Sequence, residues 1–122
     1  MREILFRAKT VCDGDWIYGG ITWNPSKKKV FIHTEWDEGE VIPETVGQYT
    51  GLCDKNGTKI FEGDIVHWKK VPYFVRWDSQ KAEFVFADDM DADYFVAGFN
   101  EYTTSKFCKV IGNIHDNPEL LK

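Results

Sequence analysis

Glu62, Asp64 and His67 lie close together in the sequence, around the start of a short apolar segment. Carboxylates and an imidazole are the groups that enzymes use for general acid–base chemistry. In a β-strand, however, residues three positions apart point to opposite faces, so Asp64 and His67 would not meet. Gly63 allows a kink, and the aspartate after it can accept hydrogen bonds from nearby backbone amides. We therefore favour turn capping for these carboxylates, and a small enzyme using Glu62, Asp64 and His67 stays an alternative.

Histidines and cysteines could together hold a metal ion or form a nucleophile pair. Metal sites usually show a characteristic spacing such as HExxH or paired CxxC, and neither pattern occurs in this sequence. A reactive thiol also needs an electropositive setting, which the sequence does not provide. We predict no cofactor, no metal site and no Cys–His nucleophile pair among these residues, which are His33, His67, His115, Cys12, Cys53 and Cys108.

The segment "DDMDAD" resembles the start of a calcium-binding loop through Asp89, Asp91 and Asp93. The EF-hand pattern requires glycine at its sixth position and glutamate at its twelfth. The sequence has Tyr94 and Asn100 there instead. We interpret the segment as a solvated acidic loop, and the wider stretch "DDMDADYFVAGFNEY" fits either such a loop or a short helix.

The composition is that of a globular chain with many aromatic residues. The chain has 122 residues, of which 43% are hydrophobic and 16% aromatic, and its formal net charge is −5. This length predicts a single domain over residues 1–122. Nucleic-acid binding usually needs a basic footprint, which the balance of charge disfavours, although Lys27, Lys28 and Lys29 form a local cluster. The N-terminus has no signal-peptide pattern and no apolar run approaches membrane-spanning length, so we expect a soluble, cytoplasmic protein with reduced thiols.

Apolar residues alternate with polar ones in many short segments, among them "DWIYGGITW", "KKVFIHTE", "VPYFVRWD" and "AEFVFA". Alternation with period two between turn residues predicts seven or eight short antiparallel strands. "WDEGEVIPET" is expected to be a long connection, because Pro43 cannot lie in a central strand. Asn117, Pro118 and Glu119 predict the start of a short C-terminal helix. The predicted fold is mainly β, either a small, partly open antiparallel barrel or two packed sheets.

The stretch "VGQYTGLCDKNGTKIFEGDIV" contains the clearest hairpin signal in the chain. Asn56-Gly57 tolerates positive φ and suits a tight turn between residues 49–52 and 58–61. Turn chemistry explains most of this composition without any ligand. Four polar positions are explained least by backbone geometry and are our candidate interaction residues: Tyr49, Asp54, Glu62 and Asp64.

The segment "IPETVGQYTGLCDKNGTKIFEGDIV", the starting "FRAK", the "WIYGG" and the closing "VIGNIHDNPELL" closely resemble the YopX-like family of phage and prophage proteins. The resemblance covers both ends and the middle of the chain, and residues 71–104 match least. It implies a bacterial or phage origin and a small, mainly β, cytoplasmic protein. It implies no catalytic residues.

Aromatic side chains exceed what the core of so small a chain needs, so we expect some of them to stay exposed. An exposed aromatic patch on an acidic protein most often marks a protein interface. The leading hypothesis is a non-enzymatic phage or prophage accessory protein that forms a homo-oligomer or binds a host or phage protein. The alternative is association with single-stranded nucleic acid by stacking on aromatic side chains. The aromatic residues considered are Trp16, Tyr18, Trp23, Tyr49, Trp68, Tyr73 and Trp77.

Overall fold

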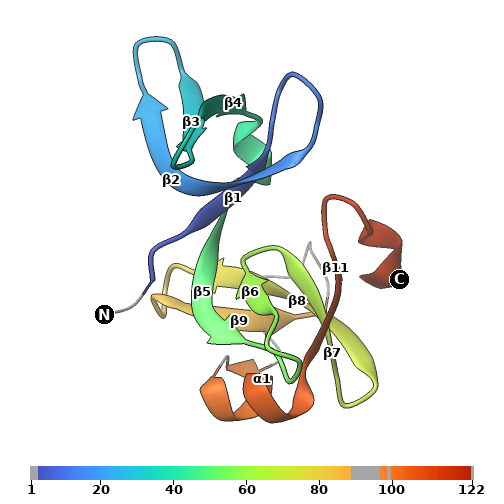
Figure 1. Cartoon of the computed structure of the whole chain (residues 1–122). Helices are drawn as coiled ribbons and strands as arrows, with labels where there is room; N and C mark the ends of the chain where they lie inside the picture. Colours follow the sequence, from blue (N-terminus) through green and yellow to red (C-terminus); the bar gives the residue numbers. More distant parts are fainter. Residues whose placement is uncertain (1–2, 89–96, 99, 122) are drawn as a thin grey trace. The chain divides into compact units, whose positions relative to one another are not determined.

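The computed structural model describes residues 3–88, 97–98 and 100–121 of the chain. The chain groups into two compact units, residues 1–49 and residues 50–122 (Figure 1). The boundary falls inside one β-strand, which begins in the first unit and ends in the second. The candidate calcium loop with Asp89, Asp91 and Asp93 lies outside the described residues.

The first unit is an antiparallel sheet in the order β4-β3-β2-β1-β5. Beyond the end of β1, Thr10 forms an isolated antiparallel bridge with Val41, and the Val11 amide donates to the Glu40 carbonyl at 3.0 Å. The sheet therefore curls, so that the edge strand β4 contacts the residues that follow β1. The elements of this unit are β1 (Phe6–Lys9), β2 (Trp16–Asn24), β3 (Lys29–His33), β4 (Glu38–Val41), the 3-10 helix η1 (Pro43–Thr45) and β5 (Gly47–Cys53).

The core of the first unit lies on one face of these strands. Ala8, Val30, Ile32 and Val41 are buried and form one cluster. Val30 pairs with Val41 across β3 and β4, and Ile32 lies two positions further along the same face. This is the alternation that "KKVFIHTE" predicts, because one side of the strand is buried and the other faces solvent.

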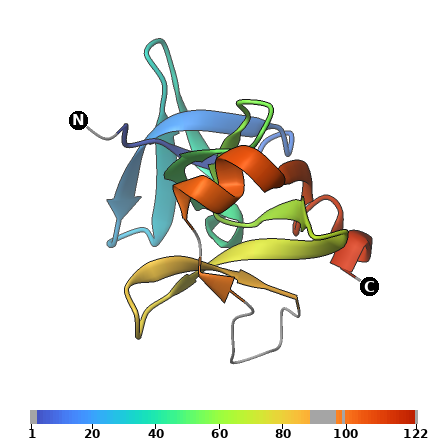
Figure 2. The same ribbon diagram turned by 90° about the horizontal axis from the view of Figure 1, so that it is seen from below.

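The second unit holds a five-stranded antiparallel sheet in the order β10-β9-β8-β7-β11. The yellow strand β8 runs between β7 and β9 (Figure 2). A further strand, β6, pairs with the end of β5. The elements are β6 (Lys59–Phe61), β7 (Asp64–Trp68), β8 (Val71–Asp78), β9 (Glu83–Ala87), β10 (Ala97–Gly98), α1 (Glu101–Phe107), β11 (Lys109–Asn113) and the 3-10 helix η2 (Pro118–Leu121).

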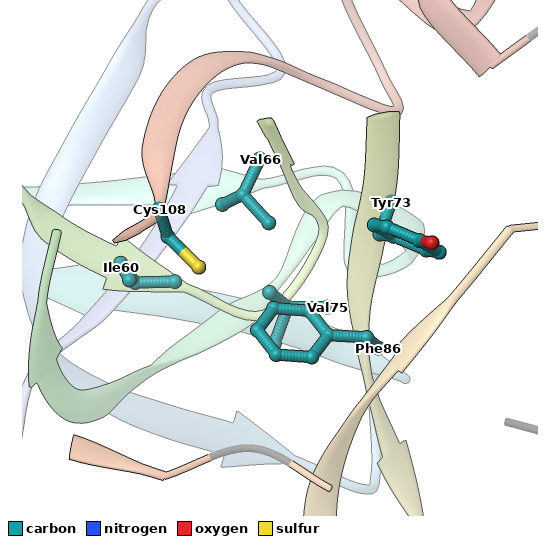
Figure 3. Close-up of a cluster of buried hydrophobic side chains, with 6 residues drawn as sticks. All are labelled: Ile60, Val66, Tyr73, Val75, Phe86 and Cys108. Atoms are coloured by element: carbon teal, nitrogen blue, oxygen red, sulfur yellow. The ribbon is translucent and has the colours of Figure 1, made fainter. Parts of the chain in front are cut away.

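Two apolar clusters cover opposite faces of the five-stranded sheet. Figure 3 shows the larger one, in which the Cys108 thiol lies among apolar side chains. The smaller one lies on the other face and packs against Leu120 and Leu121 of η2. Neighbouring residues of β7 are therefore both fully buried, Ile65 on one face and Val66 on the other. The larger cluster comprises Ile60, Val66, Tyr73, Val75, Phe86 and Cys108, and the smaller one Ile65, Phe74 and Ala87.

The structure confirms the predicted mainly β class with a short C-terminal helix. Among the described residues neither sheet closes fully into a barrel. The helix is a single 3-10 turn after Asn117, whose carbonyl accepts a hydrogen bond from the Leu120 amide at 3.1 Å. One connection was wrongly predicted, because residues 38–41 form β4. The prediction of a single domain stays a prediction.

Candidate functional site

Asp54 holds the predicted hairpin turn together. Its Oδ1 accepts the amides of Asn56 and Thr58, both at 2.9 Å, and Gly57 adopts the expected positive φ of 82°. Its Oδ2 accepts the amide of Val110 at 2.9 Å, which ties the turn to β11. The residue is only 4% exposed. Both carboxylate oxygens are therefore engaged inside the protein, and the structure gives Asp54 a structural role.

Asp64 has the same kind of role at the next turn. Its Oδ2 accepts the Phe61 amide at 2.8 Å, and the residue is 2% exposed. Gly63 adopts a φ of 91°, as the kink requires, and its carbonyl accepts the Ile114 amide at 2.9 Å. The turn between β6 and β7 is thus fixed by backbone and carboxylate contacts together, as the capping interpretation predicts.

The acid–base candidates are not brought together by the fold. Asp64 is buried at the start of β7, whereas His67 is exposed on the opposite face of that strand. Glu62 is half-buried in the turn that precedes β7. Tyr49, the remaining candidate interaction residue, is buried in the first unit at 8% exposure. The interaction role of these positions stays a prediction, and of the four only Glu62 is not buried.

Cys108 is a buried thiol in the larger core cluster. Burial, and secondarily the Asp54 carboxylate, raise its pKa from 9.0 to about 11. The thiol therefore stays protonated at neutral pH, and only the thiolate is an effective nucleophile. Cys12 is exposed and Cys53 is half-buried. Cys108 acts as a small apolar side chain.

Three polar side chains on neighbouring strands of the first unit, Thr22 of β2, His33 of β3 and Glu38 of β4, contact one another in a row that the sequence did not predict. The Nε2 atom of His33 contacts the Thr22 hydroxyl, and its Nδ1 atom lies 2.8 Å from a Glu38 carboxylate oxygen. A hydroxyl, imidazole and carboxylate in this order could activate a nucleophile. Catalysis of that kind depends on a site that excludes water, but the side chains of His33 and Glu38 are 40% and 50% exposed. We interpret the three residues as cross-strand partners that help to fix strand register.

Exposed apolar side chains concentrate in β2. Trp23 is 53% exposed, Tyr18 47% and Ile21 37%. Trp36, which follows β3, is 88% exposed. The second unit exposes Trp77 at 45%, but its ring packs edge-on against Phe84 with centroids 5.1 Å apart. The predicted surplus of exposed aromatic side chains is confirmed, and its largest share lies in the first unit.

Charges of opposite sign occupy the two turns that flank β3. The lysine turn (residues 25–28) joins β2 to β3 and exposes Lys27 and Lys28. The acidic turn (residues 34–37) joins β3 to β4 and exposes Glu35 and Asp37. Because a strand separates the two turns, this part of the sheet is basic at one end and acidic at the other.

Comparison with known proteins assigns nearly the whole chain to one family. A family model described as "YopX protein" matches residues 6–122. The chain belongs to the YopX protein family. The match confirms the resemblance based on "FRAK", "WIYGG", "IPETVGQYTGLCDKNGTKIFEGDIV" and "VIGNIHDNPELL", and it runs through both compact units of this YopX family protein.

A solved structure supports the fold of this family member. The crystal structure of protein EF1440 from Enterococcus faecalis is similar to it with a TM-score of 0.65 and 22% sequence identity, covering 100% of both chains. At that identity the likeness concerns the fold alone. No curated protein matches the chain. None of the helices in the described residues is long and apolar enough to cross a membrane.

Proposed function

We propose that this YopX family protein is a non-enzymatic accessory module of a phage or prophage that acts in the bacterial cytoplasm by self-association or by binding another protein. The observation that carries the proposal is the exposed apolar pair on one face of β2, Ile21 and Trp23, with Tyr18 exposed on the other face of the same strand. Apolar side chains gathered on the surface of an otherwise charged chain are typical of interaction sites. The phage setting rests on the sequence motifs shared with the family.

The surroundings of the candidate catalytic groups support the proposal that the protein is not an enzyme. The Asp54 and Asp64 carboxylates accept backbone amides inside the protein. The Cys108 thiol is protonated, and the His33 imidazole lies on an exposed sheet face. These groups make contacts within the protein, whereas Tyr18, Ile21 and Trp23 of β2 are exposed and lie outside the buried apolar clusters.

The proposal is tested by sedimentation velocity over a range of protein concentrations, together with affinity capture from bacterial lysate. We expect a mass above that of one chain, or a specific partner that a Trp23→Ser variant no longer retains. A protein that is monomeric at every concentration and retains no partner would refute the proposal.

A further inference from the structure

Strand β2 changes its pairing partner halfway along its length. Residues 16–19 pair with β1, and residues 20–24 pair with β3. Within the described part of the chain, nothing pairs with the other edge of residues 20–24. In an antiparallel strand alternate residues direct their N–H and C=O groups to the same edge. This five-residue segment therefore presents backbone donors and acceptors to solvent over about 15 Å.

The edge lacks the features that normally prevent strand addition. Proteins protect exposed edges with charged side chains, proline or bulges. Residues 20–23 are Gly, Ile, Thr and Trp, all four are exposed, and the first proline follows the strand. Ile21 and Trp23 pair with the buried Ile32 and Val30, so they extend the core face of the sheet outward to this edge. An added strand would continue both the hydrogen-bond ladder and the apolar face.

We propose that a second copy of this chain occupies this edge, with residues 20–24 of the two copies paired antiparallel about a two-fold axis. This inference rests on the proposed function of self-association and names its surface and geometry. The pairing buries Ile21 and Trp23 of each copy against the same residues of the other. A two-fold interface of this kind uses one patch twice and closes at two copies.

The charges at the two ends of the sheet select this arrangement. Asn24 pairs with Lys29, so the lysine turn lies at that end of β2, and Gly20 pairs with His33, so the acidic turn lies at the other end. Antiparallel pairing brings the lysine turn of each copy to the end where the partner has its acidic turn. A parallel arrangement would place like charges together. Charge complementarity of this kind sets orientation and partner choice.

The exposed Trp36 adds to the same complementarity. It lies in the acidic turn and is 88% exposed. An aromatic face attracts lysine ammonium groups, and the antiparallel arrangement directs the partner's lysine turn toward this end of the sheet. One geometry therefore gives a role to the open edge, the exposed apolar residues and both charged turns.

The test compares matched variants by sedimentation velocity, with circular dichroism to confirm folding. Trp23→Lys is expected to raise the dissociation constant of the dimer at least about tenfold. Trp77→Lys changes a similarly exposed tryptophan of the second unit and should leave dimerisation unchanged. If both variants dimerise like the wild type, the β2 edge is refuted while self-association stands. If the wild type itself is monomeric, self-association and this interface are both refuted.

Charge reversal gives a second measurement that alters only exposed side chains. Lys27→Glu with Lys28→Glu should weaken dimerisation, and adding Glu35→Lys with Asp37→Lys should restore it. Raising the salt from about 50 mM to about 500 mM should weaken the wild-type dimer, because exposed charges are then screened. Failure of the combined reversal to restore binding would overturn the antiparallel geometry.

Crosslinking reports the register directly. In the symmetric pairing, Thr22 lies opposite the same residue of the second copy, at a Cα separation of about 4.5–5.5 Å. Thr22→Cys, in a background carrying Cys12→Ser, should therefore form a disulfide-linked dimer under mild oxidation. Ser26→Cys, placed in the lysine turn, should not. Equal crosslinking of the two variants would contradict the proposed pairing.

Discussion

At the scale of single residues, Asp54 and Asp78 perform the same local task in different surroundings. Each accepts two amides of the turn that follows it: Asp54 those of residues 56 and 58, Asp78 those of residues 80 and 81. Asp54 also accepts the Val110 amide of β11 and is buried, whereas the bonds of Asp78 are exposed to solvent. The comparison separates the contribution of turn capping from that of a buried link between distant segments.

Asp54→Ala is expected to lower the free energy of unfolding by about 2–4 kcal/mol, because partly buried amides lose their acceptor and water cannot fully replace it. Asp78→Ala is the matched control and should cost less than about 1 kcal/mol, since water reaches its amides. Urea denaturation of both variants measures the difference. Equal costs would contradict the structural role that we assign to Asp54.

The raised pKa of Cys108 predicts an alkaline loss of stability. The unfolded thiol loses its proton near pH 9.0, whereas the folded thiol keeps it to about pH 11. The contribution of Cys108 to the free energy of unfolding is therefore constant below pH 9. It falls as the pH rises from about 9 to about 11, because in that range the unfolded state has released the thiol proton and the folded state has not. The difference in unfolding free energy between wild type and Cys108→Ala should shrink over that range. A difference independent of pH would contradict the prediction.

At the scale of an element, β2 depends on two neighbouring glycines with different surroundings. A Cβ atom at Gly19 would clash with the His33 carbonyl oxygen, whereas at Gly20 it would meet nothing within 4 Å. The first glycine is therefore required for the close approach of β2 to β3. The second tolerates a side chain.

Gly19→Ala should destabilise the protein by on the order of 2 kcal/mol or more, because backbone must shift to relieve the clash. Gly20→Ala is expected to lie within about 0.5 kcal/mol of the wild type, as surface substitutions usually do. Thermal unfolding followed by circular dichroism compares the two directly. Similar melting temperatures for both variants would show that β2 does not need this close approach.

At the scale of the whole molecule, the distribution of charge favours protein binding over the nucleic-acid alternative. The formal net charge is −5, and the cluster at residues 27–29 includes Lys29, whose Nζ lies 3.7 Å from Glu40. Lys27 and Lys28 remain as an exposed basic pair at the end of the β2–β3 hairpin. Two lysines form a small footprint beside the many phosphate contacts of typical nucleic-acid binders.

We expect no retention of single-stranded DNA in filter binding at physiological salt. Any binding at low salt should disappear in the variant carrying Lys27→Glu and Lys28→Glu. Binding by the wild type that is strong at low salt and falls steeply as salt rises would instead support the nucleic-acid alternative, because phosphate contacts release counterions.

The sequence by itself determined the strand class, the two tight turns and the family. Asn56-Gly57, Gly63 and the alternation in "KKVFIHTE" are local signals, and local backbone preference is enough to place them. It did not reveal β4, because residues 38–41 are short and polar and become a strand only by pairing with β3.

Only the tertiary structure decided which contacts the candidate residues make inside the protein. Asp54 became a structural residue because β11 presents the Val110 amide to it from 56 positions away in the sequence. Thr22, His33 and Glu38 came together because strand register aligned them. The open edge of β2 exists because β1 leaves it where β3 begins to pair. Such contacts depend on how distant segments pair, and neither composition nor local periodicity specifies that pairing.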